Sequence, residues 1–526
     1  MRVLAFVAAL VGSIALASAQ ASVSAEQVQQ ALRRGCDWLY STQREDGTWE
    51  KGNVPNPDAR PNDHDGGQFG GRTALAVYAL LAAGEKHDDP RLAKAVEFLK
   101  RAEITGVYAV SMRMLAFSFL PQTDEVRQLI GRDGRLLLRM VKTEGRAAGH
   151  YDYTPNVRAP HIYSHSRSQY GALGVWVAAQ TGFEIPQNYW ALVERGWVNN
   201  QDASGGWTYT HAADNRLNHP LTPGMTAAGI ATLYITNDFL YSRQGLDCRG
   251  NIYNPAIDKG MAWMAKHMDD VATDRRYDRD FPYATLYAVE RIGVASGLKY
   301  IGDVDWYAKG AAWLVGKQTR NGNWTGTSTL LDTHADSCFA LLFLARGRAP
   351  VVFNKLQYDI PAPRGQDRRE ANWNQRPRDV ANIVRWIGKQ VERDLNWQVV
   401  PIDRPLRQLH DAPMLFISGN QALNFTDEQK AKLRDYVLQG GIIVGHADCR
   451  AQAFARSFAE LGGQLFNEQG YEFRELEESS PIYTNQAFPR SAWRRKPGVQ
   501  ALSNGTRELM ILIARVDAGR DWQQDD

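Results

Sequence analysis

The feature that most limits how this chain can fold is an internal repeat of sixteen residues. The pattern Arg/Lys-Gly-x-x-Trp-Leu-x-x-x-Gln-x-x-x-Gly-x-Trp occurs at residues 34–49 and again at 309–324, and its second half recurs at 201–207. Each copy predicts the end of a helix followed by a glycine-assisted turn, in which the indole lies over the glutamine amide and fixes one repeat against the next. The shared positions with this structural role are Trp38, Gln43, Trp49, Gln201, Trp207, Trp313, Gln318 and Trp324.

The hydrophobic spacing between Glu26 and Gly347 predicts six pairs of helices. The first helix of a pair is amphipathic, as the apolar positions within 28–39 and 92–99 show. The second helix is apolar on all sides, so it is expected to be buried. The six helices of this second kind cover 73–81, 112–120, 170–179, 226–235, 284–292 and 338–344. Six buried helices inside six amphipathic ones predict an all-α (α/α)6 toroid over residues 25–348.

The repeated motif resembles the QW motif of squalene and oxidosqualene cyclases. More widely, the chain resembles the terpenoid cyclase and protein prenyltransferase superfamily. The resemblance implies a toroid whose reactive groups face a central cavity, at the points where the inner helices begin. Within that family the Gln and Trp side chains hold helices together, so the motif implies architecture and leaves the chemistry open.

The character of the chain changes after Arg348. Residues 349–378, with Pro350, Pro361 and Pro363, are expected to connect two domains. A second domain is expected over 379–526, where short apolar strands alternate with helices. This order predicts an open α/β sheet of the Rossmann-like or flavodoxin-like kind. The expected strands are 396–402, 414–418 and 442–444, and the expected helices are 379–391, 427–438 and 451–461.

The second domain is similar to the domain of unknown function family 4159, which is regarded as glutamine-amidotransferase-like. The resemblance rests on the strand at 415–420, the helix and turn at 433–441, and the Asp448-Cys449 pair. Cys449 lacks the flanking glycines of a nucleophile elbow, so it is not expected to be an amidotransferase nucleophile. Instead, Asn420, His446, Asp448 and Cys449 are expected to line a ligand crevice at the strand ends.

Composition limits the class of partner. The chain has 61 Lys and Arg against 58 Asp and Glu, a balance that argues against nucleic acid as the main partner. The partner is therefore expected to be a small molecule or a protein, which the sequence does not identify. The four cysteines permit a disulfide but do not predict a pairing, and buried free thiols are the expected state of most of them.

The N-terminal residues predict export. Arg2 precedes an apolar run, and small residues follow at Ala17-Ser18-Ala19, which is typical of a signal peptide over 1–21. No later apolar run reaches the ~18 residues that a membrane-spanning helix needs. The expected location is the periplasm or the extracellular medium.

One group of residues offers ligands for a metal. Asp336-Ser337-Cys338 opens the sixth buried helix and resembles the Asp-x-Cys that holds zinc, with a histidine, in protein prenyltransferase β-subunits. His64 or His334 would complete a set that suits catalytic Zn²⁺ with one open position. The alternative is that Cys338 is a buried apolar side chain and that His334 and Asp336 cap the helix. No other cofactor is predicted.

A second group offers acid and base chemistry. His165, Arg167 and Tyr170 are the residue types that toroidal polysaccharide lyases use, although they also serve as ordinary packing groups. Tyr283, His334 and Asp336 are also expected to face the cavity. Terpene cyclisation is disfavoured, because the chain has no Asp-x-Asp-Asp run and Asp303-Val304-Asp305 has only part of one.

The sequence thus supports two hypotheses of function. The favoured one is an exported protein that binds a ligand or partner through the toroid cavity and the α/β crevice. The alternative is an enzyme that acts on an isoprenoid or a glycan in the toroid cavity. Whether the chain is an enzyme stays open, because no complete catalytic motif is present.

Overall fold

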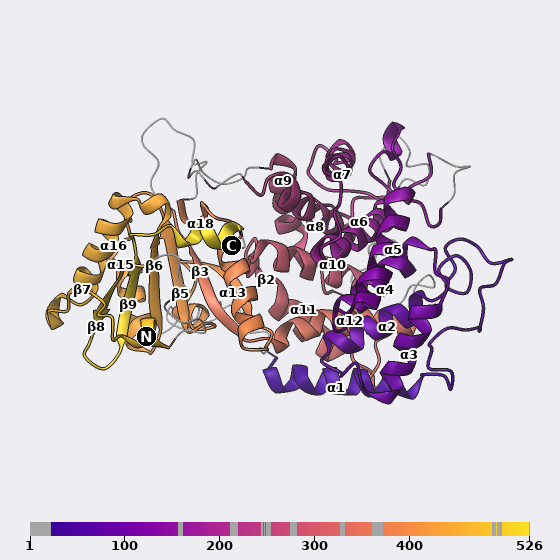
Figure 1. Cartoon of the computed structure of the whole chain (residues 1–526), viewed down its shortest axis with the longest axis horizontal. Helices are drawn as coiled ribbons and strands as arrows, with labels where there is room; N and C mark the ends of the chain where they lie inside the picture. The colour runs from indigo at the N-terminus through magenta and orange to yellow at the C-terminus, as the bar shows by residue number, and fades with distance from the viewer. Residues whose placement is uncertain are drawn as a thin grey trace, which may run out of the picture.

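The computed structural model describes residues 23–155, 161–210, 219–243, 246, 248, 254–273, 281–326, 332–359, 372–485, 491 and 497–524. The expected signal peptide and the two prolines of the connection, Pro361 and Pro363, lie outside these residues. A helical body and an α/β domain lie side by side (Figure 1). Among the described residues, no helix combines the length and the hydropathy needed to cross a bilayer.

The helical body is an (α/α)6 toroid. Each inner helix packs against the next one, and the sixth packs against the first, which closes the ring. The inner helices are α2 (Gly71–Ala82), α4 (Val107–Ser118), α6 (His165–Gln180), α8 (Pro223–Leu240), α10 (Pro282–Ser296) and α12 (Thr333–Ala345). The outer helices are α1 (Ala25–Ser41), α3 (Pro90–Arg101), α5 (Asp124–Met140), α7 (Gln187–Asn199), α9 (Pro255–His267) and α11 (Trp306–Lys317). The toroid predicted from hydrophobic spacing is therefore confirmed.

Burial follows the sequence pattern of the two helix series. In α8, every residue from Pro223 to Leu233 is buried, whereas α1 buries only the stripe that contains Val28, Leu32 and Leu39. An inner helix contacts protein on all sides, so it has no position for a charged face. Gly229 of α8 allows close approach, because a Cβ atom at this position would lie 2.7 Å from the ring of Trp207.

The three copies of the motif make the same contacts. The indole N–H donates to a main-chain carbonyl ten residues earlier: Trp49 to Leu39 at 2.8 Å, Trp207 to Trp197 at 3.0 Å and Trp324 to Leu314 at 2.8 Å. Each glutamine Nε2 donates both to the glycine carbonyl of its own turn and to a carbonyl of the next outer helix. These second acceptors are Arg91 of α3, Ala256 of α9 and Ala31 of α1. The glutamine therefore joins neighbouring repeats, and Gln318 joins the last repeat to the first.

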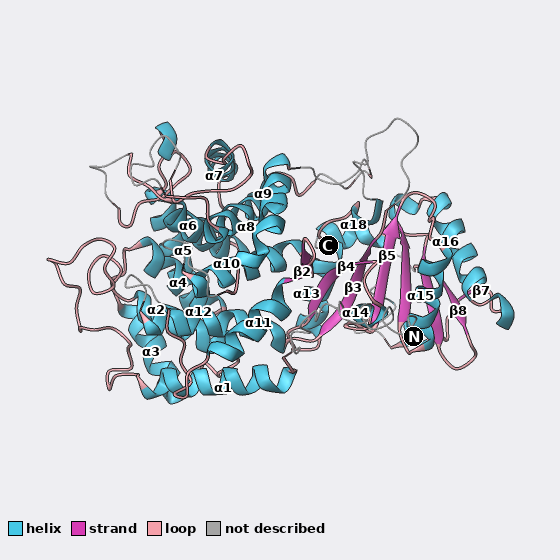
Figure 2. Cartoon of the chain, turned by 180° about the vertical axis from the view of Figure 1, so that it is seen from behind, coloured by secondary structure: helices cyan, strands magenta, loops and turns pink. Residues whose placement is uncertain are grey.

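The α/β domain contains a seven-stranded mixed sheet with the order β4-β3-β5-β6-β9-β8-β7 (Figure 2). The first five strands in this order are parallel, while β8 is antiparallel to both β9 and β7. The strands are β3 (Val351–Gln357), β4 (Asn396–Pro401), β5 (Met414–Gly419), β6 (Ile442–Ala447), β7 (Phe473–Glu475), β8 (Val499–Ser503) and β9 (Glu508–Ile513). The main helices are α13 (Asp379–Gln390), α15 (Asp427–Leu438), α16 (Gln452–Leu465) and α18 (Ala518–Gln524).

The strand order places a topological switch point at β3. The chain leaves β3 for β4 on one side and returns to β5 on the other side. Right-handed crossovers then put α13 on one face of the sheet and α15 on the opposite face. In such sheets ligands bind at the carboxyl ends of the strands beside the switch point.

The structure differs from the sequence expectation at β3, which lies within the stretch expected to be a connection. The apolar run of this strand is interrupted by Asn354 and Lys355, both fully buried. Lys355 Nζ lies 2.6 Å from Asp379 Oδ1, and the Asn354 amide donates to the carbonyl of Leu409 at 2.7 Å. Because Asn354 and Lys355 are polar, the sequence pattern predicted a linker where the structure has the interior strand β3.

The two domains are joined through the backbone. Val399 of edge strand β4 donates its N–H to the carbonyl of Gly297 at 2.7 Å, and the N–H of Lys299 donates to the carbonyl of Val399 at 3.2 Å. Leu298 and Val399 thereby form a parallel bridge. The segment that follows α10 in the toroid covers the edge of the sheet.

Candidate functional site

A cavity of about 640 Å³ lies where the inner helices begin. All six inner helices contribute residues to it, from their first two turns. Apolar and aromatic side chains lie deeper along the helices: Leu75, Met112, Tyr170, Ala288 and Phe339. Polar side chains lie nearer the helix starts and in the adjoining loops: Asn62, His64, Arg72, Tyr108, Tyr153, Ser166, Arg167, Tyr209 and Asp332. The cavity thus has a mainly apolar floor, to which Gln169 and Thr285 also contribute, and a polar rim.

The two arginines of the rim are each paired with a carboxylate. Arg72 forms an ion pair with Asp332, the N-cap residue of α12. Arg167 Nη1 lies 2.7 Å from Asp152 Oδ1, and its guanidinium lies 3.8 Å from the ring centroid of Tyr153. Neither of these guanidinium groups brings an uncompensated charge to the cavity.

The three residues predicted to act on a substrate are not brought together. Arg167 and Tyr170 line the cavity, but His165 does not. His165 is fully buried, and its Nδ1 lies 2.6 Å from the carbonyl oxygen of Thr208. Burial raises the pKa of Tyr170 well above its usual value, so this phenol stays protonated at neutral pH.

The predicted zinc ligands do not form a site. Asp336 Oδ2 accepts the N–H of Gly326 at 2.7 Å, and burial raises the pKa of Asp336 to about 6. Cys338 is buried, which raises the pKa of its thiol. His64 lines the cavity, with Nε2 at 3.7 Å from Asp65 Oδ1. Within the described part of the toroid, no three His, Cys, Asp or Glu ligand atoms lie within 4.8 Å of one another.

His334 and Tyr283 pack against tryptophans of the repeated motif. The ring of His334 lies 5.0 Å from that of Trp38, and burial lowers the pKa of His334 to about 4. The ring of Tyr283 lies 5.4 Å from that of Trp313, and its side chain is buried. Neither residue lines the cavity.

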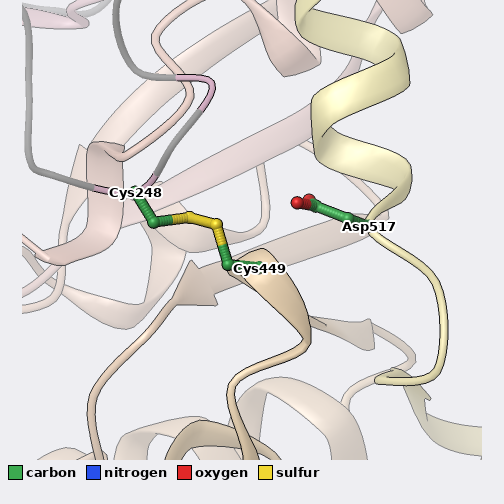
Figure 3. A group of neighbouring side chains, drawn as sticks. All are labelled: Cys248, Cys449 and Asp517. Carbon is green, nitrogen blue, oxygen red and sulfur yellow. A yellow bond between two sulfur atoms is a disulfide. The ribbon is translucent and has the colours of Figure 1, made fainter.

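The second place expected to bind a ligand is the carboxyl end of the sheet. Here Cys449, two residues after the end of β6, forms a disulfide with Cys248, which follows α8 of the toroid (Figure 3). The two cysteines are 201 residues apart in sequence. Asn420, directly after β5, donates its amide to the carbonyl of Cys248 at 3.2 Å. The sulfur expected to face a ligand instead joins the two domains. The other two cysteines, Cys36 and Cys338, are buried free thiols, so half of the four cysteines are free where most were expected to be.

Most of the remaining polar groups of this crevice bind one another, but Asn420 Oδ1 and Asp448 Oδ2 are buried with no hydrogen-bond partner among the described residues. His446 Nδ1 lies 2.9 Å from Asp448 Oδ1, and its Nε2 accepts the N–H of Gly519 at 3.1 Å. Arg376 Nη2 donates to Asp517 Oδ2 at 2.7 Å and lies 3.3 Å from each sulfur of the disulfide. His446, Asp448 and Asp517 lie close enough to hold a cation. However, the guanidinium of Arg376 already supplies positive charge to this group, so the arrangement favours a protein ion pair.

Sequence reasoning missed two groups that shape these places. Arg376 is fully buried in the crevice, yet it falls in the charged stretch taken for a connection. Asp152 neutralises Arg167 from the loop before α6, at a position that no helical pattern marks. The role of Arg376 depends on a partner that is distant in sequence, and Asp152 lies on a loop, so no local pattern identifies either residue.

Comparison with known proteins agrees with this division of the chain. Residues 352–526 match the family described as Domain of unknown function (DUF4159). No curated protein matches the sequence of the chain.

Two solved structures are similar to the helical part. One is the type II terpene cyclase MstE from Scytonema in its apo form, with a TM-score of 0.40 and 13% identity over 62% of this chain and 98% of that one. The other is the GH76A α-1,6-mannanase of Salegentibacter sp. HEL1_6, with a TM-score of 0.43 and 10% identity over 61% of this chain and 98% of that one. The closed ring of helix contacts is what establishes the toroid. The chain therefore carries an (α/α)6 toroid followed by a DUF4159 domain.

Proposed function

We propose that this chain binds an amphipathic small molecule in the toroid cavity. The observation that carries the proposal is the division of the cavity into an apolar floor and a polar rim. A site of several hundred Å³ with apolar walls and a few polar groups is typical of small-molecule binding. The apolar part of the ligand would lie against Leu75, Met112 and Phe339, and its polar part beside Arg72 and Arg167.

Binding has more support than catalysis. An acid or base needs a titratable group within reach of the substrate. The Asp332 and Asp152 carboxylates are paired with arginines, and His165 lies outside the cavity, so His64 and His219 are the imidazoles that line it. The alternative proposal, an enzyme acting on an isoprenoid or a glycan, would have to use Arg167 and Tyr170, the two residues of the predicted acid–base group that line the cavity, without His165. The toroid is also favoured over the crevice, where most polar side chains already bind protein groups.

We also propose that the protein is exported. Disulfides persist in oxidising compartments and are rare in the cytosol. The Cys248–Cys449 disulfide therefore supports the prediction of a signal peptide. A fusion of residues 1–21 to a reporter enzyme, assayed in periplasmic and cytosolic fractions, tests this proposal.

Titration with anilinonaphthalene sulfonate, an amphipathic fluorescent probe, tests the cavity. The purified chain is expected to enhance the fluorescence of one bound probe molecule, in a saturable manner. Ala284→Trp places an indole among the lining residues of α10 and should abolish this binding.

Val294→Trp is the matched control. It adds the same side chain to the same helix, at a position that is 41% exposed and outside the cavity, so probe binding should be unchanged. Circular dichroism checks that both variants are folded. Equal probe binding by the two variants would show that the cavity is not the site.

A further inference from the structure

A buried arginine, Arg291, lies at the inner end of the toroid cavity. It follows Ala284 and Ala288 on α10 by seven and three residues, and both alanines line the cavity. Residues at this spacing share one face of a helix, so Arg291 continues the cavity-lining face one turn further from the rim. Its Nη2 donates to Gln169 Oε1, and its guanidinium carbon lies 5.8 Å from the ring centroid of Tyr170. Gln169 and Tyr170 both line the cavity.

The hydrogen bonding of this guanidinium is incomplete. Arg291 is 9% exposed, and its Nε and Nη1 have no hydrogen-bond partner among the described residues. These two atoms carry three of the five N–H donors of a guanidinium. The partner of Nη2 is a neutral amide. A buried donor without an acceptor is unfavourable, and more so in a charged group, so this position favours an additional acceptor.

The positive charge of Arg291 has little compensation. Within the described chain it forms no ion pair with a carboxylate, in contrast to the two arginines of the rim. Glu290 precedes it, but burial raises the pKa of Glu290 to about 7, and Arg346 acts on this carboxyl more strongly than Arg291 does. The rings of Tyr170 and Tyr287 attract a cation through their faces without neutralising it. The surroundings of Arg291 therefore favour an anion.

We propose that the amphipathic ligand of the cavity is a carboxylic acid and that Arg291 binds its carboxylate. The inference rests on the proposed function and specifies the class of ligand. Because Gln169 both lines the cavity and contacts the guanidinium, its side chain must turn aside to admit the carboxylate. The exchange is favourable, since a carboxylate adds the charge attraction and the bidentate fit that an amide oxygen lacks.

The number of charges decides between a carboxylate and a phosphate. A carboxylate brings one negative charge to one guanidinium, and its two oxygens match the N–H fork of an arginine. A phosphate monoester brings a second negative charge into a floor made mainly of Leu75, Met112 and Phe339, where an unpaired charge is unfavourable. The arginines of the rim are already paired with carboxylates, so the rim suits a polar part of the ligand that carries no charge.

The fluorescent fatty acid cis-parinaric acid and the alcohol with the same carbon chain test the proposal. Both are titrated into the purified full chain, and the enhancement of their fluorescence gives the two dissociation constants. The acid should bind the wild type at least about tenfold more tightly than the alcohol, because a desolvated charge pair forms only with the acid. Arg291→Met removes the charge and keeps an apolar side chain. This variant should lose the preference for the acid and keep its affinity for the alcohol.

Further variants locate the carboxylate. Arg101→Met makes the same change on outer helix α3, where the side chain is 82% exposed, and should leave both dissociation constants unchanged. Loss of the acid preference in Arg72→Met or Arg167→Met, with the preference kept in Arg291→Met, would place the carboxylate at the rim and overturn the proposal. Thermal melting checks that each variant is folded. If Arg291→Met does not fold, the two rim variants decide: a preference kept in both supports the proposal, and a preference lost in either opposes it.

The outcomes also separate this inference from the proposed function. Failure of both probes to bind, or equal binding of them by the wild type and Ala284→Trp, would overturn both proposals. Equal affinity of the wild type for acid and alcohol, with both lost in Ala284→Trp, would keep the cavity as the binding site. That result would overturn only the binding of a carboxylate by Arg291.

Discussion

The toroid and the α/β domain collect polar side chains in equivalent places, at the ends of elements arranged around a centre, but with different results. At the start of the inner helices these side chains surround a cavity of about 640 Å³. At the carboxyl ends of the strands, Asn420, His446 and Asp448 contact protein groups, including Cys248 of the toroid.

The difference follows from the spacing of the elements. Packed helices lie about 8–10 Å apart, so a ring of six leaves its axis unfilled. Adjacent strands lie about 4.8 Å apart, so side chains at neighbouring strand ends reach one another. Equivalent positions therefore surround a cavity in the toroid, whereas in the α/β domain they form a network in which most polar groups contact one another.

The largest expected effect on stability comes from removing one motif tryptophan of the toroid. Trp324 is fully buried, and its N–H donates to the carbonyl of Leu314. Trp324→Ala should lower the free energy of unfolding by about 3–5 kcal/mol, as measured by urea denaturation. Trp386→Ala in the α/β domain is the control, because that side chain is 41% exposed, and it should cost less than about 1 kcal/mol. Equal losses would contradict the structural role of the motif.

The covalent link between the domains is the next test. Replacing Cys248 and Cys449 by Ser should lower the free energy of unfolding by about 2–4 kcal/mol, because the unfolded chain is no longer closed into a loop. Dithiothreitol should destabilise the wild type by the same amount. It should leave the double variant unchanged, since Cys36 and Cys338 are free thiols. Sensitivity of the double variant to dithiothreitol would argue against this pairing.

Ring closure can be tested with two equivalent glutamines. Gln318 donates to Ala31 of the first repeat at 2.8 Å, and Gln201 donates to Ala256 of the adjacent outer helix at the same distance. In a closed ring each change to Ala should cost about 1–2 kcal/mol in urea denaturation, because two hydrogen bonds are lost. A silent Gln318→Ala beside a costly Gln201→Ala would indicate an open array of helices.

The smallest expected effect is a dependence on pH. Burial lowers the folded-state pKa of His334 to about 4, from a usual value of 6.5. As the pH falls, His334 therefore takes up a proton in the unfolded chain at a higher pH than in the folded chain. Its contribution to the free energy of unfolding is complete above pH 6.5 and is lost as the pH falls through about 4. His334→Gln should reduce the loss of melting temperature over this range. Asp336 acts in the opposite direction, because its pKa is raised, so Asp336→Asn should steepen the loss.

Local sequence patterns were sufficient to predict the toroid fold, but they did not predict which residues form its sites. Apolar inner helices and the Gln and Trp turns are visible within short windows, and the structure confirms them. The structure adds a connection that the motif does not predict, in which Gln43 reaches Arg91 of the next outer helix. That acceptor is 48 residues away, so no local pattern contains it.

The candidate site depended on side-chain direction and distant pairing. His165 and Arg167 are neighbours in sequence, but two steps along a helix rotate a side chain by about 200°. One therefore faces the core and the other the cavity. Likewise, nothing near Cys449 in the sequence points to Cys248, 201 residues earlier.

The bridge between Leu298 and Val399 has a consequence for dividing this chain. The family match begins at residue 352, yet the hydrogen bonding of edge strand β4 is completed by residues that precede it. A fragment cut at the family boundary would present bare peptide groups along one side of β4, and bare strand edges pair with other chains. Such a fragment should self-associate, so the full chain, which keeps residues 297–299 in place, is the sounder basis for work on the DUF4159 domain.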